Sequence, residues 1–236
     1  MTTATQTGKK EMVRDMFNGI APRYDFLNHV LSVGIDILWR KKAIRQIAHL
    51  KPQIMLDVAT GTGDFALEAL SLKPKQIIGI DISEGMLDLG RIKVKNRKVD
   101  DCIQLLVGDS EDMPFADNNF DAITVGFGVR NFADINKGLH EMHRVLKPKG
   151  MLVVLEFSKP KTFPIKQVYQ FYFSFILPLV GRLISKHSTA YTYLPDSVEK
   201  FPEGQTFLEM MKKNGFVEVR QIPLTFGIAS LYLGNK

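Results

Sequence analysis

The sequence has little cysteine and no long apolar run. A single cysteine, Cys102, excludes an internal disulfide framework and fits a reducing compartment. No stretch approaches the roughly 20 apolar residues of a membrane span, and the polar start MTTATQTGKKE lacks the apolar core of a secretory signal. These absences predict a cytoplasmic protein, soluble or at most peripheral on the inner face of the cell membrane.

Motifs for metal binding and covalent catalysis are also missing. In His140-Glu141-Met142-His143 the histidines stand three positions apart, so the segment does not match the zinc motif H-E-x-x-H. No G-x-S-x-G nucleophile elbow occurs in the chain. We expect no metal ion and no covalent enzyme intermediate.

Positive charge gathers in one part of the chain. Of the net charge of +6, the stretch from Arg144 to Lys166 holds six basic residues against one acid, Glu156. Such a cluster suits anionic lipid headgroups. A basic nucleic-acid-binding module is the alternative, but no DNA- or RNA-binding motif accompanies the charge. We therefore expect peripheral contact with an anionic membrane and no nucleic-acid partner.

Strand and helix signals alternate through the middle of the chain. Non-alternating runs of Ile, Val, Leu and Phe predict strands buried on both faces at Ile54–Ala59, Gln76–Asp81, Ile103–Gly108, Phe120–Gly126 and Met151–Phe157. Helices are expected between them at Phe65–Leu72, Glu84–Lys95 and Ile135–Leu146. This order predicts an α/β fold with a doubly wound parallel sheet.

The C-terminal part predicts a different strand arrangement. A short helix over Gln205–Asn214 precedes two strand-like runs, Val217–Ile222 and Ile228–Leu233. A short link containing Pro and Gly joins these runs, so an antiparallel hairpin is expected. Without repeats or low-complexity tracts, residues 1–236 are interpreted as a single domain.

Residues 9–50 and 158–204 lie outside this alternation and are interpreted as a helical cap. In the first segment a helix is expected to begin near Trp39. In the second, a narrow polar stripe runs along an otherwise apolar helix from Ile165 to Lys186, which Pro178 should kink. Core packing and a lid over an apolar substrate both explain such a helix.

A glycine-rich turn, Asp57–Asp64 (DVATGTGD), follows the first strand. Gly61 and Gly63 permit a tight turn with close backbone approach, and the turn leads into a helix whose N-terminal amides face a ligand. Asp81, at the end of the next strand, can accept hydrogen bonds from both hydroxyls of a ribose. These residues predict a nucleoside-cofactor pocket at the carboxyl edge of the sheet.

The turn also satisfies the dinucleotide pattern G-x-G-x-x-G/A, so two cofactors compete for it. A pyrophosphate here would face the carboxylates of Asp57 and Asp64. S-adenosylmethionine (SAM) instead carries a sulfonium and an ammonium, and no phosphate. Charge therefore favours SAM over the cofactor of an NAD(P) oxidoreductase.

The segment GDSEDMPF follows the third strand at the same edge. Asp109 can accept a hydrogen bond from the exocyclic amine of adenine, with Ser110 beside it. Met86, Met113 or Phe115 can supply apolar contact to the base. Capping of the following turn is the alternative role for Asp109 and Ser110.

The segment GFGVRNF follows the fourth strand. Gly126 and Gly128 leave this edge open for a substrate. Arg130 and Asn131 then offer a cation and an amide at the reacting centre. A purely structural partner is the alternative role for Arg130.

Nine segments together are specific enough to indicate a family. On them the chain resembles, nearly end to end, the bacterial ubiquinone/menaquinone biosynthesis C-methyltransferases, which include demethylmenaquinone methyltransferase. The segments are RYDFLN, LWRKK, LDVATGTGD, GIDISEGML, GDSEDMPF, DAITVGFGVRNF, MHRVLKPKG, LEFSKP and YLPDSVEKFP. The glycine turn and RVLKPKG recur across many class I methyltransferases, whereas RYD, FGVRN, LEFSKP and YLPDSVEKFP are far narrower.

The resemblance implies a class I SAM-dependent methyltransferase: a Rossmann-like, seven-stranded and mostly parallel sheet, with its last strand antiparallel. It implies methyl transfer to a ring carbon of a polyprenylated demethyl-quinol, such as demethylmenaquinol, in menaquinone or ubiquinone biosynthesis. Carried over by position, Thr62, Asp81, Asp109 and Ser110 bind SAM. A methyltransferase for another lipid or small molecule is the competing interpretation, and the oligomeric state stays open.

For the chemistry, Arg130 and Asn131 are expected to handle a phenolate, and Tyr24 or Tyr193 to position the acceptor. The general base stays open among Asp25, His29, His187, Tyr24, Tyr191 and Tyr193. The chain departs from the family at two positions. Asp36 stands where many relatives have histidine, and Gly126 stands where some have a serine linked to SAM contact.

Overall fold

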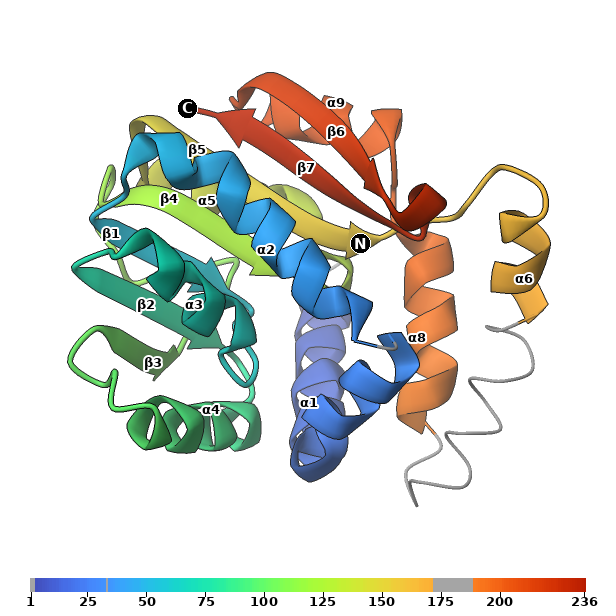
Figure 1. Ribbon diagram of the computed structural model, residues 1–236, viewed down its shortest axis with the longest axis horizontal. Helices are drawn as coiled ribbons and strands as arrows, with labels where there is room; N and C mark the ends of the chain where they lie inside the picture. Colours follow the sequence, from blue (N-terminus) through green and yellow to red (C-terminus); the bar gives the residue numbers. More distant parts are fainter. Residues whose placement is uncertain (1–2, 33, 172–188) are drawn as a thin grey trace.

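The computed structural model describes residues 3–32, 34–171 and 189–236, and one seven-stranded sheet forms its centre (Figure 1). The strands are β1 (Ile54–Val58), β2 (Gln76–Asp81), β3 (Ile103–Val107), β4 (Phe120–Gly126), β5 (Leu146–Phe157), β6 (Val217–Leu224) and β7 (Ala229–Asn235). They lie in the order β3-β2-β1-β4-β5-β7-β6. Strands β1 to β5 pair in parallel, and β7 is antiparallel to both β5 and β6. The predicted, mostly parallel sheet with a C-terminal antiparallel hairpin is confirmed.

Helices cover both faces of this sheet. They are α1 (Thr3–Ser32), α2 (Ile35–Ile47), α3 (Asp64–Ala69), α4 (Glu84–Asn96), α5 (Ile135–Val145), α6 (Ile165–Phe171), α8 (Thr189–Lys200) and α9 (Gln205–Lys213). Helices α2, α3 and α4 pack on one face, and α5 and α9 pack on the other.

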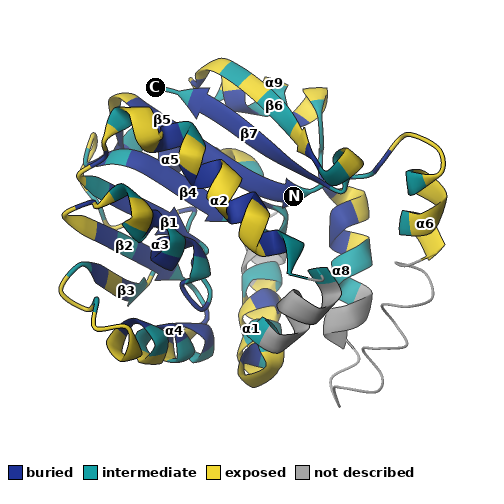
Figure 2. Cartoon of the chain, viewed as in Figure 1, coloured by how far each residue is buried: buried dark blue, intermediate teal, exposed yellow. Residues whose placement is uncertain are grey.

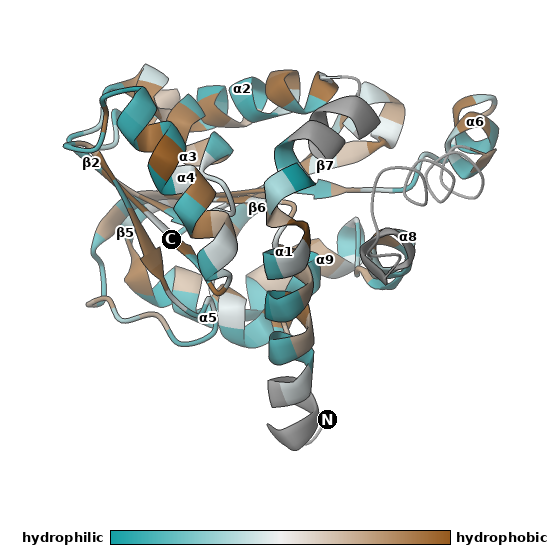
Figure 3. Cartoon of the chain, turned by 90° about the horizontal axis from the view of Figure 1, so that it is seen from below, coloured by the Kyte–Doolittle hydropathy of each residue, from teal (hydrophilic) through white to brown (hydrophobic). Residues whose placement is uncertain are grey.

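Two hydrophobic clusters fill the space between sheet and helices. Because side chains alternate along a strand, Met55 belongs to the first cluster, whereas Leu56 and Val58 belong to the second. Figure 2 shows most of β4 and β7, and β5 from Gly150 onward, as buried. Figure 3 shows the hydrophobic strands β2 and β5 between the helical layers. Burial on both faces explains why these strands are continuous apolar runs.

Two elements start at least four residues before their predicted starts. Helix α2 begins at Ile35, four residues before Trp39, directly after Gly34 with a φ of 74°. Strand β5 begins at Leu146 instead of Met151, because Leu146 already pairs with Phe120 of β4. The segment KPKG (residues 147–150) is thus part of the strand.

Of the helices in the segments outside the alternation, α1 and α8 lie near each other beyond the carboxyl ends of the parallel strands, whereas α2 packs on one face of the sheet (Figure 1). Helix α6 covers the start of the predicted apolar helix. The kink predicted at Pro178 lies outside the described residues. The same holds for three polar positions of that predicted helix, Ser174, Arg182 and Lys186. None of the described helices has the length and apolarity needed to cross a membrane.

Candidate functional site

The glycine-rich turn joins β1 to α3 and is closed by its own backbone. Gly61 and Gly63 both have positive φ values, 56° and 81°. The Gly63 amide donates to the Thr60 carbonyl at 2.9 Å, and the Thr60 amide donates to Ile80 of β2 at 3.0 Å. The predicted tight turn therefore lies at the carboxyl edge of β1 and β2.

Asp57 lies beneath this turn and is only 1% exposed. Its two carboxylate oxygens accept hydrogen bonds from the hydroxyls of Thr60 at 2.6 Å and Thr124 at 2.7 Å. Burial raises the pKa of Asp57 to about 6, against an ordinary value of 3.8. Asp57 thus ties the turn to β4 through hydroxyl groups.

Asp81 ends β2 and faces the other side of the turn. It accepts hydrogen bonds from the backbone amides of Gly61 and Ser83, both at 2.9 Å. Burial raises the pKa of its carboxyl group. Met86 lies behind Gly61, because a Cβ on that glycine would be 3.2 Å from the Met86 Cε. The turn, the acid and the methionine thus form one wall.

That wall borders a cleft of about 670 Å³ at the carboxyl edge of the sheet. Several residues selected from the sequence line this cleft: Tyr24, Gly61, Asp81, Met86, Asp109, Ser110 and Asn131. The structure therefore brings together the residues expected at the ribose and at the adenine. Gly128 and Phe132 line the cleft as well.

Helix α1, which belongs to the segment interpreted as a cap, lies along the cleft. Val13, Phe17 and Tyr24 line the cleft from this helix. Lys10 Nζ lies 2.6 Å from Asp109 Oδ2 and 3.0 Å from Glu111 Oε2. Burial lowers the pKa of Lys10, but its bonds to the two acids outweigh burial and the pKa is raised.

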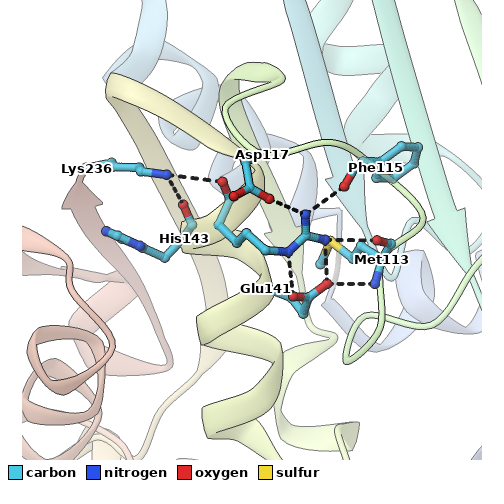
Figure 4. A network of polar contacts seen from close by, with 7 residues as sticks. Met113, Phe115, Asp117, Glu141, His143 and Lys236 are labelled. Atoms are coloured by element: carbon cyan, nitrogen blue, oxygen red, sulfur yellow. Dashed lines mark hydrogen bonds and ion pairs between the residues drawn. The ribbon is translucent and has the colours of Figure 1, made fainter.

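The loop that carries Asp109 is anchored to α5 by an arginine (Figure 4). Arg144 donates to the carbonyls of Met113 at 2.9 Å and Phe115 at 2.7 Å. Its neighbour Glu141 accepts from the Met113 amide at 2.9 Å. The C-terminal Lys236 donates to the Arg144 carbonyl at 3.1 Å, so the chain end supports the same helix terminus.

Arg130 is not one of the residues that line the cleft, and its side chain forms a buried ion pair. Its Nη1 is 2.9 Å from Glu156 Oε2, and the two side chains are 7% and 0% exposed. Its guanidinium carbon lies 5.5 Å from the centre of the Phe157 ring, and Nη1 also donates to the Phe127 carbonyl. Burial raises the pKa of Glu156, although Arg130 opposes that effect.

Asn131 lines the cleft and has an unusual hydrogen-bond pattern. Its Nδ2 donates to the Phe127 carbonyl at 3.3 Å. Its Oδ1 is buried and has no hydrogen-bond partner among the residues that the structure describes. A buried acceptor without a partner is costly, so this oxygen is suited to a ligand donor.

The candidate bases are dispersed. Asp25 accepts from the Thr62 hydroxyl at 2.6 Å and pairs with Lys93 at 2.6 Å. Tyr193 is half-buried, and burial raises the pKa of its phenol. The side chains of His29, His187 and Tyr191 lie outside the described residues. Within the described ranges, no group of three or more His, Cys, Asp or Glu side chains is placed to hold a metal ion.

Gly126 ends β4 under the side chain of Phe65. A Cβ at this glycine would lie 2.7 Å from Phe65 Cδ2. A serine, as some relatives have, would therefore require the phenylalanine ring to move.

A second chamber of about 430 Å³ continues from the cleft. Tyr24, Ala59, Gly61, Gly126 and Phe127 line both spaces. The second chamber is otherwise lined by Arg40, Asp57, Thr60, Thr62, Asp64 and Phe65.

The sequence is similar to those of known methyltransferases. The profile of the ubiE/COQ5 methyltransferase family matches residues 4–236. A demethylmenaquinone methyltransferase of Bacteroides fragilis is 50% identical over 229 residues, covering 97% of this chain and 94% of that protein. The ubiquinone/menaquinone biosynthesis C-methyltransferase UbiE of Citrifermentans bemidjiense is 50% identical over 230 residues, covering 97% of each.

Solved structures agree on the fold. A SAM-dependent methyltransferase of Thermotoga maritima superposes with a TM-score of 0.66 at 20% identity, covering 94% of this chain and 99% of that one. A SAM-dependent methyltransferase of Aquifex aeolicus gives a TM-score of 0.55 at 19% identity, covering 82% and 88%. With the class I methyltransferase fold in place and the family profile matched almost end to end, the chain belongs to the ubiE/COQ5 methyltransferase family.

Proposed function

We propose that this protein transfers a methyl group from SAM to a ring carbon of a polyprenylated demethyl-quinol, with demethylmenaquinol as the acceptor. The observation that carries the proposal is the nearly full-length match to the family at residues 4–236, since relatives at 50% identity bear that activity in their names. The cleft at the carboxyl edge of the sheet supplies a matching site.

The residues of the cleft fit SAM. Asp81 would accept from the ribose hydroxyls, Asp109 and Ser110 would flank the adenine, and Thr62 would lie near the amino-acid part. The buried Oδ1 of Asn131 is an acceptor for which the described residues provide no donor. When bound, SAM supplies an electrophilic methyl group on a sulfonium.

The acceptor must be a reduced quinol, and one of its hydroxyls must lose its proton at least in part. The resulting phenolate raises the electron density on the adjacent ring carbon. In this proposal Asn131 and Arg130 handle the phenolate oxygen, and Tyr24 or Tyr193 positions the ring. Orientation of the two reactants supplies much of the rate, and a general base adds about 10²- to 10⁴-fold.

The same function motivates two structural proposals. Residues 1–236 act as one methyltransferase domain in which segments 9–50 and 158–204 form a cap over the acceptor. The cap also brings the protein to an anionic membrane, where its lipid substrate resides. Phe163 is 82% exposed beside the exposed Lys161 and Lys166, a combination suited to a lipid surface.

Titration calorimetry with SAM, S-adenosylhomocysteine and NADH tests the cofactor. We expect micromolar binding of SAM and S-adenosylhomocysteine, loss of both in Asp81→Ala, and no binding of NADH. Binding of NADH alone would overturn the proposed function. Methyl transfer from labelled SAM to reduced demethylmenaquinone, compared with a demethylated benzoquinol, then tests the acceptor.

Flotation with vesicles of phosphatidylcholine and phosphatidylglycerol tests membrane contact. We expect the protein to float with the anionic vesicles at low salt, and a Lys161→Glu/Phe163→Ser variant to remain in the soluble fraction. Equal behaviour of the two proteins would overturn the contact at α6 and leave the methyl transfer proposal intact.

A further inference from the structure

The second chamber differs in chemistry from the cleft that it joins. Its lining is mostly polar and includes the hydroxyls of Thr60 and Thr62 and the carboxylates of Asp57 and Asp64. Arg40 is the one cation among the described residues that line it. A chamber with a single cation and nearby carboxylates suits a ligand carrying charges of both signs.

Arg40 comes from α2 and is 9% exposed as a residue. Its Nη2 lies 2.7 Å from Asp36 Oδ2 and 3.7 Å from Asp64 Oδ2. In the part of the chain that the structure describes, Nε and Nη1 of Arg40 have no protein hydrogen-bond partner. A buried guanidinium with an unused pair of donors is suited to a bidentate carboxylate.

Asp36 holds this guanidinium in place. Its Oδ1 accepts from the Ser32 hydroxyl at 2.6 Å, and its side chain is 4% exposed. Asp64 is paired on its other side, because Lys93 Nζ lies 2.7 Å from Asp64 Oδ1. Both acids therefore have fixed positions near Arg40, and neither occupies its Nε or Nη1.

The position of the chamber matches one part of SAM. If the nucleoside lies along Asp109 and Asp81, the path away from the ribose passes Gly61 and Gly126, which line both spaces. The methionyl part then enters the second chamber. That part is a zwitterion with one carboxylate and one ammonium.

On these observations, which rest on the proposed function, we infer that Arg40 binds the α-carboxylate of the amino-acid part of SAM through Nε and Nη1. The ammonium then lies toward Asp64. Asp36, which stands where many relatives have histidine, is a positioning residue that orients Arg40. The chamber accordingly selects adenosyl ligands that carry a complete amino acid.

Calorimetry with three ligands tests this role. S-adenosylhomocysteine carries the complete amino acid, decarboxylated SAM lacks only its carboxylate at that end, and 5′-methylthioadenosine lacks the amino acid altogether. In Arg40→Met we expect the Kd of S-adenosylhomocysteine to rise about 10- to 100-fold, because a hydrogen bond between charged groups is lost. The Kd values of the other two ligands should change less than about twofold, since neither makes this bond.

Two further variants keep the result interpretable. Arg45→Met removes an exposed arginine of the same helix and should leave all three affinities unchanged. If Arg40→Met does not fold because Asp36 is left buried and unpaired, the double variant Asp36→Asn/Arg40→Met removes both charges. The same loss of selectivity is expected there.

Four outcomes decide whether Arg40 binds the carboxylate. An equal loss for all three ligands, or unchanged binding of S-adenosylhomocysteine, would overturn the assignment of Arg40 and leave SAM as the cofactor. A wild-type protein that binds none of them would overturn the proposed function itself. A loss confined to S-adenosylhomocysteine supports the carboxylate site.

Discussion

At the scale of single residues, the site rests on buried charge. Asp57 and Glu156 are 1% and 0% exposed. The carboxylate of Asp57 accepts hydrogen bonds from two hydroxyls, and that of Glu156 pairs with a guanidinium. Their environments differ, so their removal should have different consequences.

Asp57 should make the stability depend on pH. The folded protein holds the proton of Asp57 with a pKa of about 6, against 3.8 ordinarily. Because the folded state binds this proton more tightly, the contribution is complete below about pH 4 and is lost as the pH rises through about 6. The loss reaches about 3 kcal/mol of unfolding free energy at neutral pH.

Asp57→Asn removes this titration. Urea unfolding should show the variant gaining stability relative to wild type between about pH 4 and pH 7. Asp101→Asn, at an exposed position, should show a constant difference from wild type. A constant difference for Asp57→Asn as well would contradict the raised pKa.

Loss of Arg130 should destabilise the fold, because Glu156 would lose its ion-pair partner. Arg130→Met leaves a fully buried carboxylate without its partner and should lower the unfolding free energy by about 3–5 kcal/mol. The double variant Arg130→Met/Glu156→Gln removes both charges and should recover most of that loss. Thermal and urea unfolding of the three proteins measure the difference.

The double variant also separates two roles of Arg130. If Arg130 stabilises the phenolate, the folded double variant should bind SAM with the wild-type affinity but transfer methyl groups with a greatly reduced kcat. Full activity in that variant would remove Arg130 from the proposed chemistry and leave it a structural partner.

At the scale of elements, the loop from Asp109 to Asp117 depends on α5 for its position. Arg144 binds two of its carbonyls, and Glu141 binds one of its amides (Figure 4). The loop itself contributes Asp109, Ser110 and Glu111 to the cleft. A substitution in α5 should therefore change the position of the residues proposed to contact the adenine.

Arg144→Met should weaken SAM binding without a direct contact to SAM. We expect the KM for SAM to rise about 3- to 10-fold, equivalent to about 1 kcal/mol, with little change in kcat. Steady-state kinetics at saturating acceptor measure the two constants. Arg97→Met, at an exposed arginine, is the control and should leave both constants unchanged. A fall in the kcat of Arg144→Met at constant KM would contradict a role of the loop limited to SAM binding.

At the scale of the whole molecule, the last strand completes the sheet from within. Strand β7 lies between β5 and β6, and Leu231, Tyr232 and Leu233 are at most 1% exposed. These residues of β7 are therefore part of the core.

Deletion of residues 229–236 should abolish the fold. It removes the partner of β5 and β6 together and exposes two strand edges and their apolar faces. Near-UV circular dichroism and gel filtration should show loss of tertiary structure or aggregation. Lys236→Met is the control, because it keeps β7 and loses only the hydrogen bonds to the carbonyls of His143 and Arg144. It should remain folded, with an unfolding free energy lower by about 1 kcal/mol. A deletion protein that folds would contradict the prediction.

Local patterns were sufficient for most elements. Strands β2 and β4 coincide with the predicted ranges, because strands buried on both faces are continuous apolar runs. The turn at Gly61 and Gly63 was predictable because both residues adopt a positive φ that favours glycine. Boundaries set by pairing, such as the start of β5 at Leu146, were not.

The sequence by itself determined the alternation of strands and helices, the glycine turn, and the acids that follow β2 and β3. These depend on hydrophobic periodicity and on residues close together along the chain. Only the tertiary structure decided that α1 lies along the cleft, where Lys10 meets Asp109 across 99 positions, and that Arg40 lines a second chamber beside the turn. The tertiary structure also placed Arg130 in a buried ion pair with Glu156. The sequence could not show this pair, because packing between distant segments leaves no local signal in it.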